Sequence, residues 1–182
     1  HIKRERATSN ICTAQALLAI MAGFYAVYHG QDGLKAIAFR IHSLAASLQA
    51  SIDKLGYKNT NEYFFDTLHV ELPDGVDMGQ LKKLALDHKL NLRYFDDNQH
   101  IGISLDETTD ENDIGLLAAI FAKAAGKDNF ELSFPDVSFD NIETLPENLK
   151  RTTKFLSHSA FNSYHSETEM MRYLKKLENK DI

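Results

Sequence analysis

The spacing of apolar residues changes from a helical to a strand-like period near residue 56, and this change limits the possible folds. From Leu34 to Leu55, apolar side chains recur in steps of three and four residues, which places them in one stripe along a helix. Residues 100–105 instead alternate apolar and polar side chains, as in a strand with one buried face. A chain with both patterns packs helices against a sheet, so we predict an α+β fold.

Two helices are predicted before the sheet begins. The first covers residues 13–28 and is apolar on nearly all sides, so we expect it to be largely buried. Gly30 lies where this helix should stop, and a second helix follows over residues 33–55. Because only residues 29–32 separate the two helices, we predict a helical corner or hairpin.

The middle of the chain supplies the sheet. Residues 62–70 are rich in aromatic and β-branched side chains and predict a strand, and residues 91–95 and 100–105 predict two more. One short helix opens at Asp77 and a longer one near residues 109–110. The order helix, helix, strand, helix, strand, strand, helix predicts a sandwich with a small, mainly antiparallel sheet.

The pattern weakens after residue 126. Residues 127–163 carry aromatic side chains among prolines and acids, which favours an ordered extended arm over a flexible linker. Ser166 then begins an amphipathic helix. One face of this helix carries Met170, Tyr173, Leu174 and Leu177, and the arm before it carries Phe130, Phe134 and Phe139. We therefore predict a small domain at residues 1–126 and an arm with a helix at residues 127–182.

Composition excludes several classes of protein. The formal net charge of −6 argues against a broad nucleic-acid-binding face. A single cysteine, Cys12, allows no disulfide within the chain and favours a reducing compartment. No apolar run reaches the roughly 18 residues that a membrane-spanning helix needs. The chain starts at His1 and ends directly after a helical run, so we expect it to be an internal piece of a longer protein.

No self-contained catalytic or metal-binding motif is visible. His158 and His165 have no cysteine near them in the sequence, which favours packing or surface roles over a metal site. The acidic residues of 106–113 lack the spacing of a calcium loop and favour a helix start. Cys12 would need a neighbouring base to act as a nucleophile, and the sequence identifies none.

Small polar residues precede the first helix. Thr8, Ser9 and Asn10 have hydroxyl and amide side chains that can cap a helix or, with exposed N–H groups, bind an anion. From the residues alone, helix capping is the favoured interpretation and anion binding stays open.

Three stretches of the sequence carry a family resemblance. Residues 1–17 read HIKRERATSNICTAQAL, residues 102–108 read GISLDET, and residues 161–170 read FNSYHSETEM, with a further stretch at 176–182. In this order they resemble the middle region of the glycine cleavage system P-protein family. The resemblance covers nearly the whole chain, and its first and third motifs are long and specific.

The resemblance implies a pyridoxal-phosphate enzyme with two related halves, each like an aminotransferase-type (fold type I) subunit. Such an enzyme decarboxylates glycine and transfers the aminomethyl group to the lipoyl arm of H-protein. Residues 1–126 would be the C-terminal small domain of the first half, and residues 127–182 an arm that leads into the second half. The partners implied are that second half or subunit, H-protein and glycine.

The resemblance also implies where the chemistry lies. In the family the Schiff-base lysine belongs to the second half, beyond Ile182, so this chain is expected to contain no catalytic residue and to bind no pyridoxal phosphate directly. Residues 100–104 read HIGIS, without the carboxylate-binding arginine of related enzymes, which fits a half whose own site has degenerated. The loop of Thr8, Ser9, Asn10 and Thr13 would lie at the interface between halves, near the catalytic pocket.

An alternative from another class is a stand-alone α+β module that binds a small ligand or a regulatory partner. The aromatic arm argues against this module, because a tail of that kind needs a surface to pack on. For the chain alone, the exposed apolar faces of its first and last helices predict a homodimer. The expected location is the cytoplasm in a bacterium or the mitochondrial matrix in a eukaryote.

Overall fold

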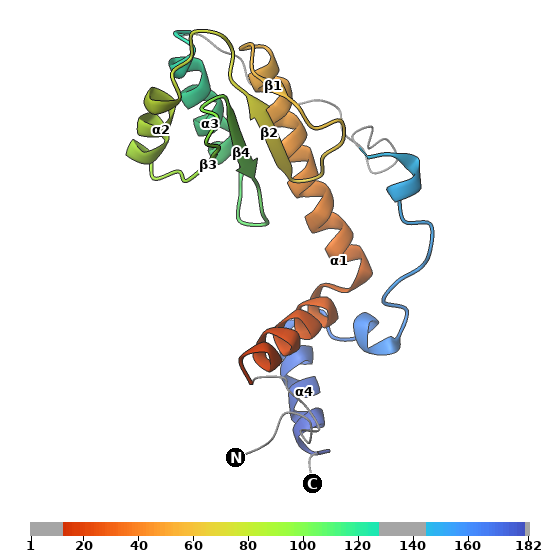
Figure 1. Ribbon diagram of the computed structural model, residues 1–182. Coiled ribbons are helices and arrows are strands. Elements are labelled where there is room, and N and C mark those ends of the chain that lie inside the picture. The colour runs from red at the N-terminus through yellow and green to blue at the C-terminus, as the bar shows by residue number, and fades with distance from the viewer. Residues whose placement is uncertain (1–12, 128–144, 181–182) are drawn as a thin grey trace, which may run out of the picture. The chain divides into compact units, whose positions relative to one another are not determined.

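The computed structural model describes residues 13–127 and 145–180. These residues form two compact units, residues 37–151 and residues 1–36 with 152–182, which we call the sheet unit and the helical unit (Figure 1). The boundary between the units falls within the first helix, α1. This grouping differs from the division predicted after residue 126, which concerns the domains of a longer protein and stays a prediction.

Helix α1 covers Thr13–Asp53 and joins the two predicted helices. Its only residue with non-helical backbone angles is Gly30, with φ of 62° and ψ of −170°. The prediction of two helices around Gly30 is therefore confirmed, but the four-residue connection is wrong. Glycine has no Cβ and can adopt these backbone angles without a steric clash. One residue is therefore enough to change the direction of the helix, and helical geometry resumes directly after it.

Gly30 is packed too closely to carry a side chain. A Cβ atom at this position would lie 2.7 Å from Cε1 of His165 and 2.8 Å from the carbonyl oxygen of Phe161. The imidazole of His165 occupies this space because its Nδ1 lies 2.8 Å from the carbonyl oxygen of Tyr28. Both the backbone angles and the contacts therefore require glycine.

The variant Gly30→Ala should destabilise the helical unit. Its backbone angles belong to a region that only glycine occupies readily, at a cost of about 1–3 kcal/mol for other residues, and the contact with Phe161 adds to this cost. Thermal unfolding should show a lowered midpoint. The matched control is Gly23→Ala, in the same helix with no atom near its Cβ, which should be neutral or stabilising by about 0.5–1 kcal/mol. An equal effect of both changes would contradict the prediction.

The sheet of the sheet unit has four strands in the order β1-β2-β4-β3. The strands are β1 (Lys58–Asn59), β2 (Thr67–Glu71), β3 (Arg93–Tyr94) and β4 (His100–Ser104). All three pairings are antiparallel, and Leu68 of β2 lies opposite Ile103 of β4. The predicted α+β class and the small antiparallel sheet are thus confirmed.

The strand predicted at residues 62–70 is only half right. Residues 62–66 form bends, and β2 begins at Thr67. The aromatic side chains leave the strand path to pack on His42 of α1. The ring of Phe65 stacks on His42 with centroids 5.3 Å apart, and Nδ1 of His42 lies 2.7 Å from the Phe65 carbonyl oxygen. Phe64 is buried in the core. The short strand β1 was not predicted.

The core lies between one face of the sheet and the helices of the sheet unit. The stripe of α1 joins the inward side chains of β2, β4 and helix α3 in one cluster, which includes Leu44, Leu48, Ile52, Leu68, Val70, Ile101, Ile103, Ile114, Leu117 and Phe121. The hydroxyl of buried Tyr57 donates a hydrogen bond of 2.9 Å to the Phe121 carbonyl oxygen. This bond satisfies the polar atom that Tyr57 brings into the core, and burial raises the pKa of Tyr57.

Local signals place the helices of the sheet unit. In α2 (Met78–Asp87) the side chain of Asp77 accepts from the N–H of Gln80, and in α3 (Glu111–Ala124) Asp110 and Asp113 form a reciprocal capping box. The predicted helix starts, and the helix-start role of the acidic cluster, are confirmed. Among the described helices, none is both long and apolar enough to cross a membrane.

The helical unit contains the first part of α1, the 3-10 turn Ser159–Asn162 and helix α4 (Glu167–Glu178). Another 3-10 turn, Glu147–Leu149, belongs to the sheet unit. Ser166 caps α4 by accepting from the N–H of Glu169, as predicted. The expectation that the first part of α1 is buried is wrong for this chain, because Leu17, Leu18 and Met21 are each 58–65% exposed. Too few residues surround this helix within the described chain to cover it. The predicted positions Phe130, Phe134 and Phe139 lie outside the described residues.

Candidate functional site

The predicted interface loop cannot be compared with the structure. Thr8, Ser9, Asn10 and Cys12 lie outside the described residues. Thr13 is the first residue of α1, but its side chain is not described either. The role assigned to these residues therefore stays a prediction, and the candidate sites below come from the described part of the chain.

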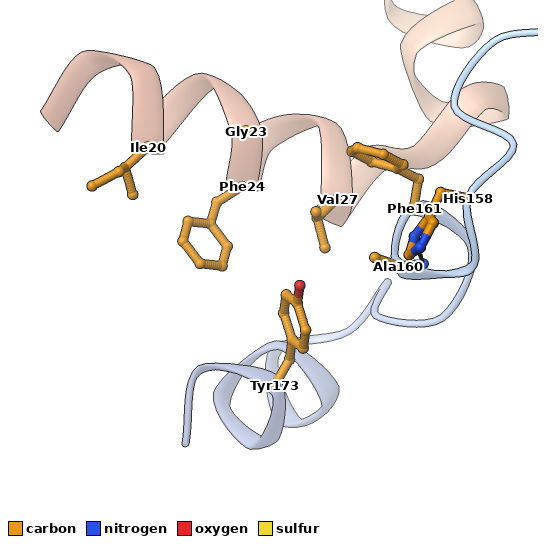
Figure 2. Close-up of a pocket in the computed structure, with 8 residues that line it drawn as sticks. All are labelled: Ile20, Gly23, Phe24, Val27, His158, Ala160, Phe161 and Tyr173. Carbon is orange, nitrogen blue, oxygen red and sulfur yellow. Dashed lines mark hydrogen bonds between the residues drawn. The ribbon is translucent and has the colours of Figure 1, made fainter. Parts of the chain in front are cut away.

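An apolar groove of about 350 Å³ lies within the helical unit. Figure 2 shows that α1 supplies one wall and that the 3-10 turn and α4 supply the other. The lining residues are Ile20, Gly23, Phe24, Val27, His158, Ala160, Phe161 and Tyr173. No charged carboxylate, lysine or arginine is among them, so the groove suits an apolar group rather than an ionic ligand.

Aromatic contacts fix the position of Tyr173 in this groove. Its ring stacks on Tyr164 with centroids 4.1 Å apart and meets the ring of Phe24 edge-on at 6.2 Å. The hydroxyl end of Tyr173 points toward α1, between Phe24 and Val27 (Figure 2). Such edge-to-face and stacked pairs stabilise the approach of α4 to α1. The groove is thus bounded by ordered aromatic rings.

The described residues do not fit pyridoxal phosphate by themselves. A Schiff-base lysine needs an enclosed pocket. Every lysine in residues 13–127 and 145–180 is exposed except Lys150, which is half-buried and paired with Glu147. A second hollow of about 190 Å³ beside Tyr173 does include Lys176 and Lys180, but both are exposed near the end of α4.

The outward face of the sheet gathers polar and aromatic side chains. His69 of β2 and His100 of β4 stack with ring centroids 4.8 Å apart, and Phe95 meets His69 edge-on at the same distance. Nδ1 of His69 lies 2.5 Å from the hydroxyl oxygen of Thr60, and Nδ1 of His100 lies 2.6 Å from Oδ2 of Asp97. The Thr60 hydroxyl also donates a hydrogen bond of 3.1 Å to the His69 carbonyl oxygen. These bonds orient both imidazoles.

An arginine also lies on this face. Arg93 of β3 is the cross-strand neighbour of Gly102, and His69 is the neighbour of Gly102 on the other side. The guanidinium of Arg93 lies 5.5 Å from the centroid of the Phe95 ring. A Cβ at Gly102 would come within 3.2 Å of Cβ of Arg93, so glycine gives this side chain its room.

This polar face was not predicted from the sequence. His69 and His100 are 31 positions apart in sequence, and only the antiparallel register of β2 and β4 brings them together. The available signal was the alternation of apolar and polar residues along each strand. Once the strands are paired, this alternation places His69 and His100 on the face opposite the apolar one. Cross-strand register, however, is not visible in a single sequence.

The remaining histidines have local structural roles. Nδ1 of His158 accepts from the N–H of Ala160 and caps the 3-10 turn. His165 packs at the α1 kink, as described above. These contacts confirm the packing roles favoured for both residues. Within the described residues no group of three or more His, Cys, Asp or Glu side chains is arranged to hold a metal ion.

The carboxylate of Asp97 should make the stability of the sheet unit pH-dependent. Hydrogen bonds from the N–H of Gln99 and from the imidazole of His100 lower the pKa of Asp97 to about 2. A lowered folded-state pKa means that the stabilisation is present above the unfolded pKa of about 4 and is lost as pH falls through the folded value. In Asp97→Asn, the deficit in unfolding free energy should therefore be largest above pH 4 and shrink toward pH 2.

Urea unfolding of the wild type and the Asp97→Asn variant at several pH values measures this difference. Asp96→Asn, which changes the adjacent exposed carboxylate, is the control for the loss of one charge. A deficit that stays constant from pH 6 to pH 2 would show that the Asp97 charge is not the cause.

Comparison with known proteins agrees with the resemblance in sequence. Residues 1–121 match the family described as glycine cleavage system P-protein. The chain is 54% identical over its whole length to a glycine dehydrogenase (decarboxylating) of Bacteroides fragilis, covering 19% of that protein. It is 53% identical to the protein of the same name from Bacteroides thetaiotaomicron, again over 19% of its length. The protein of Aliivibrio salmonicida is 50% identical and is covered over 18% of its length.

These matches define the class of protein as a component of glycine cleavage. The chain belongs to the glycine cleavage system P-protein family. It spans about a fifth of the length of the curated relatives it matches. Membership in this family argues against the alternative of a stand-alone binding module.

Proposed function

We propose that this chain is part of a pyridoxal-phosphate-dependent glycine decarboxylase, an oxidoreductase of glycine catabolism. The observation that carries the proposal is identity of 50–54% along the whole chain to proteins named glycine dehydrogenase (decarboxylating). Identity at this level over the whole of the chain, and so across both compact units, supports the same role for the corresponding region. The parent enzyme decarboxylates glycine and transfers the aminomethyl group to lipoyl H-protein.

Within the parent enzyme, the chain supplies architecture rather than a catalytic centre. The element order and the antiparallel sheet support a small domain of the aminotransferase-like (fold type I) kind at residues 1–126. Residues 127–182 would then connect this domain to the second half. Pyridoxal phosphate, when bound to the parent, acts as the electron sink for decarboxylation, and its lysine comes from residues outside this chain.

The proposal also assigns partners and a location. The second half or subunit of the P-protein covers the interface side of this chain, and H-protein delivers the lipoyl arm to the shared pocket. The relatives compared above are bacterial, which supports the cytoplasm as the location. If the chain came from a eukaryote, the mitochondrial matrix would take its place.

The parent polypeptide should release CO₂ from carboxyl-labelled glycine only when lipoylated H-protein is present. It should also retain pyridoxal phosphate through gel filtration, with an absorbance band that borohydride fixes. The 182-residue chain alone should do neither, because its described lysines lack an enclosed pocket. Retention of a borohydride-stable cofactor by the 182-residue chain would contradict the assigned role, and absence of glycine-dependent CO₂ release from the parent would contradict the function.

In the parent enzyme, the double change Ser9→Ala with Asn10→Ala should weaken cofactor binding or glycine turnover by about 10- to 100-fold. This range corresponds to about 1.4–2.7 kcal/mol, close to the loss of one hydrogen bond to a charged group at about 1.5–3 kcal/mol. The cofactor dissociation constant and the steady-state rate measure the effect. The control is Ser157→Ala with Asn91→Ala, which removes the same side chains at exposed positions. Unchanged cofactor affinity and turnover in the Ser9/Asn10 variant would refute the interface role.

A further inference from the structure

The first part of α1 is exposed although it carries no charge. Residues 13–31 contain no aspartate, glutamate, lysine or arginine. In the described chain, Leu17, Leu18, Ile20 and Met21 are each at least 55% exposed, and Tyr25 and Tyr28 about 40%. A helix of this composition normally lies in a core or a membrane, and no described helix is suited to span a membrane.

The apolar residues surround this helix rather than forming one stripe. At about 100° per residue, Leu17, Met21 and Tyr28 fall on one line, with Leu18 and Tyr25 beside it. Ile20, Phe24 and Val27 face the groove and belong to the neighbouring side. The side away from the groove carries the small residues Ala19, Ala22 and Ala26, together with the exposed amide of Gln15. Helix α4 and the 3-10 turn therefore cover one flank and leave the other sides open.

Helix α4 shows the contrast within the same unit. It has lysines in its last turn and glutamates in its first turn, as a surface helix does. Its apolar residue Tyr173 faces the groove, while its charged side chains are exposed. Helix α4 thus has a charged surface that suits contact with water, and the first part of α1 has none. The described residues therefore leave the remaining sides of the first part of α1 without cover.

We infer that, in the parent protein, residues 13–29 of α1 form an internal helix that is enclosed by parts of the same polypeptide outside these 182 residues. This inference rests on the proposed function and on the relatives, of whose length the chain spans only 19%. The enclosing surface is apolar and uncharged. It approaches the backbone closely along the side of Ala19, Ala22 and Ala26, where small side chains permit contact, and its larger side chains enter the groove beside Gly23.

A second copy of the chain is a poorer occupant. A two-fold contact covers the same patch on both copies, so one such contact leaves the other sides of α1 exposed. Interfaces between separate proteins also have a polar, charged rim around the apolar centre. Here the nearest charged residue toward the C-terminus is Asp32, beyond the kink at Gly30. Enclosure on several sides is the pattern of an internal helix.

The test uses the intact parent polypeptide with its native cysteines replaced, including Cys12→Ser. Met21→Cys is compared with Leu86→Cys, which changes a similarly exposed apolar residue of α2, since the exposed fractions are 58% and 51%. The rate at which a maleimide labels the introduced cysteine is measured for each variant in native buffer and in denaturant. We expect native labelling of Met21→Cys to be at least about 100-fold slower than in denaturant, a factor that corresponds to a protected, folded environment. Leu86→Cys should label faster than Met21→Cys in the native state.

A photoactivatable amino acid at position 21 identifies what lies on the helix. A cross-link to a peptide of the same polypeptide outside these 182 residues supports the inference. A covalent dimer overturns it in favour of a second copy, and native labelling of Met21→Cys within tenfold of the denatured rate overturns it because the helix is then open. Glycine decarboxylation is assayed on the same preparations. Activity with rapid labelling would refute only this inference, and protection without activity would refute only the proposed function.

Discussion

The sheet has one apolar face, and the stripe of α1 covers it; the other features of the sheet unit depend on this packing. Leu44, Leu48 and Ile52 are almost completely inaccessible and belong to one cluster with the inward residues of β2 and β4. Because side chains alternate along a strand, burying Leu68 and Val70 forces His69 outward. The same constraint on β4 turns His100 outward. The polar face is therefore a consequence of the core rather than an independent design.

The two parts of α1 differ in what surrounds them more than in their own periodicity. After Gly30 the helix carries charged residues such as Asp32, Lys35 and Arg40 opposite its buried stripe. Before Gly30 it carries none. A hydrophobic pattern reports how a helix would be buried, but it does not say whether the covering surface is present in the same chain. For this reason the expectation of a buried first helix was chemically sound and still wrong for the described residues.

Signals that depend on near neighbours predicted the structure well. The caps at Asp77, Asp110 and Ser166 each involve residues only two to three positions away, so the sequence contains the whole interaction. The strand at residues 62–66 failed because its aromatic residues pack on His42, more than 20 positions away. A preference for strands cannot compete with a buried ring contact of this kind. The two-residue strand β1 is too short to give any periodic signal.

The candidate sites follow the same rule. His69, His100 and Arg93 meet only through the cross-strand register, which the sequence alone does not fix. The groove beside Tyr173 needs contacts between α1 and a segment more than 100 residues later. The family resemblance supplied an expectation that neither periodicity nor local motifs contain, namely that the cofactor lysine lies outside the chain. It did not supply the geometry of either face.

Enclosure of α1 would also change the reading of the tract at Thr8, Ser9 and Asn10. The first N–H groups of any helix lack partners within the helix. At an exposed helix start, water satisfies them. At an enclosed start they need side-chain caps or a bound anion, because an unpaired buried N–H costs free energy. Helix capping and anion binding, which the sequence leaves as alternatives, therefore both become stronger expectations if the helix is internal, and the partner that encloses the helix decides between them.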